Sequence, residues 1–222
     1  MIGGKELKLI QLAIKYCKKI VSILLIILIL VTPGKSFAAE DYKINDYQRN
    51  ELIKQAQVVD WNSFDDILGY DENIIIIDYW SGRYFITSRM GGANHADIEP
   101  VDKQSTENMQ KAVKDGMGKT RRPVIVLFED GRSFLASSFM VGHAGIDSEP
   151  YLKIVDKRSN GYGKGENYDS VKGNGLDGHI CLFVDNCLNH YDGKKNYNHE
   201  ENLKFLKEAK ERALKHDYFN QD

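Results

Sequence analysis

Two stretches of the sequence place a histidine two positions from another residue that can bind a metal or take part in catalysis. MGGANHADIEP holds His95 and Asp97, and GLDGHICLFV holds His179 and Cys181. In an extended segment, side chains two positions apart project to the same side of the chain. Each stretch therefore predicts a pair of reactive side chains on one face, and together they could form one site.

Imidazole, carboxylate and thiolate are all ligands that Zn²⁺ accepts. His95, Asp97 and His179 could hold one zinc ion, with water in the fourth position and Cys181 as a further ligand or a packed neighbour. Alternatively, Cys181 is a nucleophile, with His95 or His179 as its base and Asp97 as the group that orients the base. Both pairs also have a structural interpretation, since aspartate after glycines favours turns and a free cysteine is often a small buried apolar residue.

The chain has four other histidines. His143 and His190 lie beside glycine or in loops at strand ends, where a rigid scaffold commonly presents functional groups, so they are candidate catalytic residues. His199 and His216 fall in the predicted C-terminal helix, and we expect both to be exposed to solvent.

The elements that must position these side chains include two predicted hairpins. One, within NIIIIDYWSGRYFITSR, turns at Ser81-Gly82. The other, within RRPVIVLFEDGRSFLASSFMV, turns at Asp130-Gly131, a dipeptide that favours a tight turn. A further strand is expected at residues 178–185.

Three helices are predicted around these hairpins. They are an amphipathic helix at residues 44–58, a helix capped by Ser105 or Thr106, and a C-terminal helix with Asn198 and Glu201 as a capping box. The expected fold is therefore α+β, a mostly antiparallel sheet or small barrel built from hairpins and flanked by helices at both ends.

The N-terminus predicts a secretory signal peptide. Lysines precede the apolar run IVSILLIILILV, small residues follow it, and the run is shorter than the roughly 20 residues of a spanning helix. Cleavage after Ala38 would remove residues 1–38. The protein would contact the membrane only through this segment, before cleavage. We expect residues 39–60 to form a helical leader and residues 61–222 a single α+β domain. Its long loop at 145–177 is expected to be mobile, either as a flap over a cleft or as a surface insertion.

Charge argues against a nucleic-acid partner. The chain has 30 basic and 32 acidic residues, and six lysines and one glutamate lie in residues 1–38. The remaining 24 basic and 31 acidic residues give a formal net charge of −7, which offers no electrostatic footprint for nucleic acid. Only Cys181 and Cys187 remain after residue 38, so the domain is not one that disulfides hold together.

Ordered motifs across residues 61–215 resemble a domain of secreted Gram-positive proteins that is often joined to peptidoglycan-binding repeats or bacterial SH3 modules. That domain typically reads T-G-x-x-F-x-V-x-R, N-H-A-D-V-E-P, R-R-P, a motif around P-H-G, G-H-F-C-I-H-F and T-H. The stretches here are SGRYFITSR, NHADIEP, RRP, GHAGI, GHICLFV and NH. Phe183 replaces the second histidine of G-H-F-C-I-H-F, and the peptidoglycan-binding repeat is missing.

The resemblance implies a cell-wall setting and one site made of the matching polar residues, which are His95, Asp97, His143, His179, Cys181 and His190. The expected function is a secreted, cell-wall-associated hydrolase that cleaves a peptide or amide bond of peptidoglycan. Zn²⁺ would be bound by His95, Asp97 and His179, and His143 or His190 would act as general base or oxyanion stabiliser. The alternatives are a cysteine-dependent hydrolase or transpeptidase using Cys181, and a non-catalytic wall-binding or regulatory module, which the Phe183 replacement favours.

Overall fold

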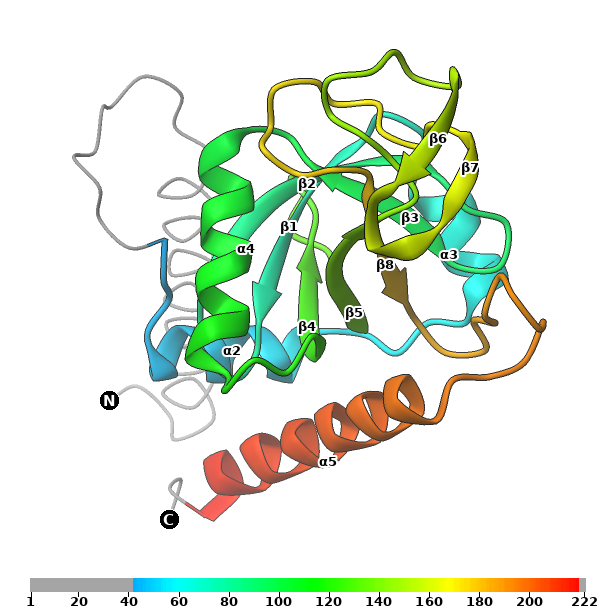
Figure 1. Ribbon diagram of the computed structural model, residues 1–222. Coiled ribbons are helices and arrows are strands. Elements are labelled where there is room, and N and C mark those ends of the chain that lie inside the picture. Colours follow the sequence, from blue (N-terminus) through cyan, green and yellow to red (C-terminus); the bar gives the residue numbers. More distant parts are fainter. Residues whose placement is uncertain (1–41, 220–222) are drawn as a thin grey trace, which may run out of the picture. The chain divides into compact units, whose positions relative to one another are not determined.

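The computed structural model describes residues 42–219 (Figure 1). The predicted signal peptide, residues 1–38, lies outside this range. Within it, no helix combines the length and the apolar character that a membrane crossing requires. Apart from the turn at residues 129–131, the described residues belong to one compact unit.

Six strands close into a barrel in the order β1-β2-β3-β8-β5-β4, and every neighbouring pair is antiparallel (Figure 1). The strands are β1 (Asn73–Asp78), β2 (Tyr84–Gly91), β3 (Ala96–Pro100), β4 (Arg121–Leu127), β5 (Ser133–His143) and β8 (His179–Phe183). Both predicted hairpins are present, as β1–β2 and β4–β5. The expected α+β fold, a small antiparallel barrel flanked by helices, is confirmed.

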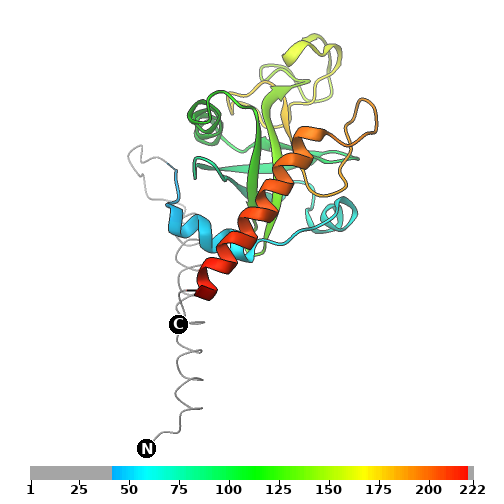
Figure 2. The ribbon, with the colours of Figure 1, turned by 90° about the horizontal axis from the view of Figure 1, so that it is seen from below.

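The sequence of β1 explains why the barrel needs cover on its outer face. Ile74 and Ile76 point into the main hydrophobic core, yet Ile75 and Ile77, on the other face of the strand, are buried as well. A strand that is apolar on both faces must be covered on both. Helices provide this cover, with α4 (Lys103–Asp115) against β2 and α5 (Tyr197–Phe219) against β4 and β5 (Figures 1 and 2).

The helix ends differ from the predicted ones. The amphipathic helix is α2 (Asp46–Gln55), shorter than residues 44–58, and a second short helix, α3 (Trp61–Ile67), follows it. The N-cap of α4 is Asp102, whose carboxylate accepts a hydrogen bond from the Ser105 N–H, so the capping roles predicted for Ser105 and Thr106 are wrong. Both of these residues are buried in the first turn.

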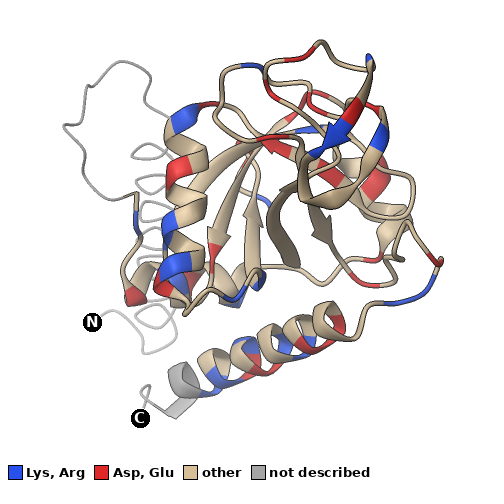
Figure 3. Cartoon of the chain, viewed as in Figure 1, with Lys and Arg blue, Asp and Glu red and all other residues tan. Residues whose placement is uncertain are grey.

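The start of α5 is capped by a residue before the predicted box. The side-chain oxygen of Asn196 accepts a hydrogen bond from the Asn198 N–H at 3.1 Å. The capping box assigned to Asn198 and Glu201 is therefore wrong by two positions. Basic and acidic residues alternate along α5 (Figure 3), and one of them, Lys207, ties the helix to the barrel domain through Asp185 at 2.7 Å.

The segment at 145–177 contains regular structure where the sequence predicted only a long loop. It holds β6 (Ile154–Arg158), the 3₁₀ turn η1 (Ser159–Gly161) and β7 (Gly163–Glu166), with β6 and β7 paired as a two-stranded sheet (Figure 1). Much of the segment is fixed by polar side chains. The carboxylate of Glu99, on β3, accepts hydrogen bonds from the backbone N–H groups of Ser170 and Val171, each at 2.8 Å.

Candidate metal centre

The register of the barrel brings the two histidine stretches together. Strand β8 lies between β3 and β5, and Asp97 on β3 is the direct cross-strand partner of Cys181 on β8. On the other side of β8, Cys181 pairs with Phe139 and His179 pairs with His143. Directly opposed residues project to the same side of a sheet. Both stretches therefore belong to one site.

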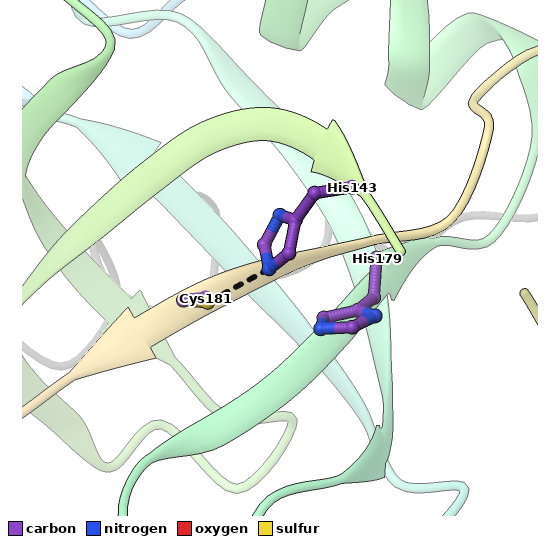
Figure 4. A group of neighbouring side chains, drawn as sticks. All are labelled: His143, His179 and Cys181. Carbon is purple, nitrogen blue, oxygen red and sulfur yellow. Dashed lines mark hydrogen bonds between the residues drawn. The ribbon is translucent and has the colours of Figure 1, made fainter. Parts of the chain in front are cut away.

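An irregularity in β5 gives His143 its position. The register between β5 and β8 shifts between Phe139 and His143, and such bulges re-aim side chains and often occur near functional sites. The rings of His143 and His179 consequently lie with their centroids 4.3 Å apart (Figure 4).

The carboxylate of Asp97 is the centre of the cluster. Its Oδ1 atom lies 3.1 Å from Nε2 of His190, 3.5 Å from Nε2 of His95 and 3.6 Å from Nε2 of His179. Burial raises the pKa of Asp97, but the hydrogen bond from His190 and the electrostatic interactions with the neighbouring histidines outweigh it and hold the pKa below its usual value. Asp97 is thus an ionised carboxylate facing three imidazoles.

His95, His143 and His179 hold their ring nitrogens in the same way. In each, Nδ1 contacts a backbone carbonyl oxygen, which can only accept, so Nδ1 carries the proton and Nε2 of the neutral ring has a free lone pair. The contacts are His95 to Leu188 at 2.8 Å, His143 to Val141 at 2.8 Å and His179 to Tyr168 at 3.2 Å. Backbone carbonyls that fix a histidine in this way are characteristic of metal sites.

The pKa values separate these histidines from His190. Burial lowers the pKa of His95 and of His143 to about 4, and it also lowers the pKa of His179. All three are therefore neutral at neutral pH. His190 is more exposed, and its hydrogen bond to Asp97 raises its pKa. It is the histidine of the cluster best able to exchange protons with solvent.

Cys181 lies beside His143, with Sγ 3.4 Å from Nε2 (Figure 4). Burial raises the pKa of this thiol well above its usual value, so the metal-free protein holds it as a neutral thiol. Cys181 and Cys187 are both free and buried. The thiol contributes a sulfur donor next to two imidazoles.

Among the described residues, the donor atoms form two adjacent groups, each with its ligand atoms within 4.8 Å of one another. The groups are His95, Asp97 and His190, and His143, His179 and Cys181. The predicted ligand set of His95, Asp97 and His179 spans both groups and is linked by the two contacts to the Asp97 carboxylate. The Nε2 atom of His95 is buried and has no hydrogen-bond partner, which suits a cation. Nitrogen, oxygen and sulfur donors together fit Zn²⁺.

A pocket of about 290 Å³ opens at the cluster. His95, His143, Cys181 and His190 line it, together with aromatic side chains and Arg121. Of the six predicted site residues, these four line the pocket, whereas Asp97 and His179 are not among its lining residues.

Sequence reasoning missed His199, which was expected to be exposed and is instead buried with 3% of its surface accessible. Its Nδ1 lies 2.7 Å from Oγ of Ser137. The ring of Phe183 stacks between His199, at 3.8 Å, and His95, at 4.1 Å. Phe183 thus packs against one face of the ring of His95, a candidate ligand. The domain that the sequence resembles has a histidine at this position.

The burial of His199 could have been inferred from helix periodicity. Positions three, four and seven residues further along a helix share one face. In α5 these positions are buried, and they are Asn202, Leu203 and Leu206. His216, the other histidine expected to be exposed, has a side chain outside the described set.

No family model, curated protein or solved structure matches this chain. Its function must therefore be argued from the chemistry of the site.

Proposed function

We propose that the protein is a secreted, cell-wall-associated hydrolase that cleaves a peptide or amide bond of peptidoglycan with the help of Zn²⁺. The observation that carries the proposal is the half-buried Asp97 carboxylate with the Nε2 atoms of three histidines around it, beside a pocket that two of these histidines line. The cell-wall setting and the export come from the resemblance and the N-terminal pattern, and the metal-assisted chemistry comes from the donor set.

In this proposal His95, Asp97 and His179 hold the metal. The two histidines are buried and neutral, and their Nδ1 atoms are engaged by carbonyl oxygens, so their Nε2 lone pairs are available without loss of a proton. A bound Zn²⁺ would polarise the scissile carbonyl and lower the pKa of a water ligand.

His190 is the residue best placed for proton transfer. It lines the pocket, its pKa is raised, and Asp97 fixes its Nε2. A general base works best when its pKa lies near the operating pH. His143 is less suitable, because both of its ring nitrogens have partners, Val141 and Cys181. Its role is to position the sulfur or to serve as a further ligand.

A cysteine-dependent hydrolase or transpeptidase is the second candidate. The contact between Cys181 and His143 favours it, because a nucleophilic thiol needs a base within reach. The raised pKa of Cys181 argues against it, since the thiolate is the reactive form. The metal-assisted mechanism makes no such demand on the metal-free protein.

The test is incubation of the purified protein with peptidoglycan sacculi, followed by measurement of released amino groups. We expect release that a chelator abolishes, that added Zn²⁺ restores, and that a thiol-alkylating reagent leaves unchanged. His179→Ala should abolish release, and Arg132→Gln, at a residue that does not line the pocket, should retain it.

Two other outcomes would contradict the proposal. Release that survives chelation but stops on alkylation, and is lost in Cys181→Ser, would support the cysteine mechanism. Binding to sacculi without release of amino groups, in a zinc-loaded protein, would support a non-catalytic wall-binding module.

A further inference from the structure

Arg121 stands in the same cross-strand row as the metal cluster. The row runs across four neighbouring strands, from Arg121 on β4 to Phe139 on β5, Cys181 on β8 and Asp97 on β3. Strands in a sheet lie about 4.8 Å apart, so Arg121 is roughly 10 Å along the sheet from Cys181. Its side chain lines the pocket that contains His95 and His190.

The half-buried guanidinium group of Arg121 lacks the anionic partner that the buried arginines Arg83, Arg89 and Arg122 have. It lies over the Phe139 ring, 4.6 Å from the ring centroid, and its Nε atom is buried without a hydrogen-bond partner. Within the part of the chain that the structure describes, it forms no ion pair. Its neighbour Arg122, by contrast, donates two hydrogen bonds to the carboxylate of Asp78.

Arg121 is also the only lysine or arginine among the described residues that line the pocket. Arg121 therefore supplies the permanent positive charge of the pocket. A half-buried guanidinium without an anion fits a carboxylate well, since the two groups can form paired, charge-assisted hydrogen bonds.

We propose that Arg121 binds the free C-terminal carboxylate of a peptide substrate, so that the pocket takes peptide ends and the enzyme releases their terminal residue. This rests on the proposed hydrolase function and makes it an exopeptidase. Water adds across the last amide bond: the acyl carbon gains a hydroxyl group, and the leaving nitrogen gains a proton and departs as the amine of the terminal amino acid. The strand row places the Arg121 backbone two strand spacings from that of Cys181, with the Phe139 ring between them supporting the guanidinium.

The test compares N-acetyl-dialanine, in the D and the L series, with the corresponding C-terminal amides, by isothermal titration calorimetry on the purified, zinc-loaded protein. We expect the acid of one series to bind at least about tenfold more tightly than its amide, as a charge-assisted contact implies. Arg121→Gln should remove this preference. Arg121→Lys, which keeps the charge but not the paired geometry, should retain part of it.

Arg132→Gln is the matched control, because Arg132 also lies over an aromatic ring, that of Phe128 at 5.0 Å, but does not line the pocket. It should bind both ligands as the unchanged protein does. Circular dichroism checks the fold of each variant. Undetectable binding of the acid, equal affinity for acid and amide, or an unchanged preference in a folded Arg121→Gln would overturn the inference.

The binding readout separates this inference from the proposed function. If the acid is preferred through Arg121 but neither dipeptide nor sacculi are hydrolysed, the hydrolase function fails and the carboxylate site stands. If sacculi are hydrolysed and the Arg121→Gln variant releases amino groups at the unchanged rate, only the inference about Arg121 fails.

Discussion

The hydrogen-bond partner of Nδ1 determines which ring nitrogen each of three histidines can offer to a metal. His95, His143 and His179 donate Nδ1–H to backbone carbonyls, which leaves Nε2 of His95 and His179 free for a cation and turns Nε2 of His143 toward the Cys181 sulfur. The sequence identified His95 and His179 from their spacing to Asp97 and Cys181, and His143 from its place beside a glycine at a strand end. It could not identify the carbonyl partner of His95, Leu188, because that contact joins residues 93 positions apart.

The pH dependence of stability tests the environment of His199. Burial lowers the pKa of His199 to about 3, whereas histidine in an unfolded chain titrates near 6.5. As the pH falls below about 6.5, the unfolded chain takes up a proton that the folded protein excludes until about pH 3, so the free energy of unfolding falls. His199 should contribute about 1.4 kcal/mol per pH unit in this window.

Urea unfolding of the metal-free protein between pH 7 and pH 4.5 measures this slope. In His199→Gln the amide can still bond to Ser137, and the loss of stability with acidification should be shallower by about one proton's contribution. Equal slopes for the two proteins would show that His199 is not held neutral by burial.

At the scale of the elements, local sequence patterns predicted the hairpins but not their assembly. Strand β8 was expected at residues 178–185, yet its insertion between β3 and β5 depends on pairing between distant segments, which no local pattern encodes. The pairing of β6 with β7 was not predicted, for another reason. Most of their residues are exposed, so they lack the alternation of apolar and polar residues that marks a half-buried strand.

The expected mobility of residues 145–177 remains a prediction, which the hydrogen bonds make more specific. Amides at residues 159–165, in the exposed end of the β6–β7 sheet, should exchange quickly with solvent. The amides of Ser170, Val171 and Gly178 bond to the carboxylates of Glu99 and Asp169 and should exchange slowly. Hydrogen exchange read out by mass spectrometry measures both parts.

Glu99→Gln provides the perturbation for this prediction. It replaces one of the two acceptor oxygens with a donor, so exchange at Ser170 or Val171 should accelerate while residues 159–165 stay unchanged. Strong protection across residues 159–165 in the unaltered protein, or no acceleration in Glu99→Gln, would contradict the account.

At the scale of the whole molecule, a buried ion pair away from the Asp97–histidine cluster is expected to carry much of the specificity of the barrel. Asp78 on β1 and Arg122 on β4 are both fully buried, and Nε and Nη2 of the arginine lie 2.6 and 2.5 Å from the carboxylate oxygens. Gly116, at the end of α4, packs so closely that a Cβ atom there would lie 1.5 Å from the guanidinium. The pair therefore links two strands and a helix.

Asp78→Ala leaves the Arg122 charge buried and unpaired and should lower the free energy of unfolding by about 3–5 kcal/mol. The double variant with Arg122→Met should recover part of this loss, because the unpaired charge is gone. Urea unfolding checks both, and the zinc content of the folded Asp78→Ala protein should be unchanged. A loss below about 1 kcal/mol would mean that water or another group compensates the arginine.

The α+β class of the molecule followed from its hairpins and terminal helices, whereas the geometry of the candidate site follows from the convergence of side chains. Repeating apolar patterns reveal strands and helices because burial selects them. Convergence of Asp97 with three histidines depends on closure of the barrel, and the anchoring role of Arg121 depends on the strand row. Neither is visible along the chain.

Zinc titration of the chelator-stripped protein, in competition with a chromophoric chelator, tests the central claim that this cluster is a metal site. The unchanged protein should bind Zn²⁺. His179→Ala should bind it at least about tenfold more weakly while keeping its circular dichroism spectrum, as expected on loss of a ligand, and His199→Gln should bind as the unchanged protein does. Failure of the unchanged protein to bind Zn²⁺, or equal affinity in His179→Ala, would contradict the account.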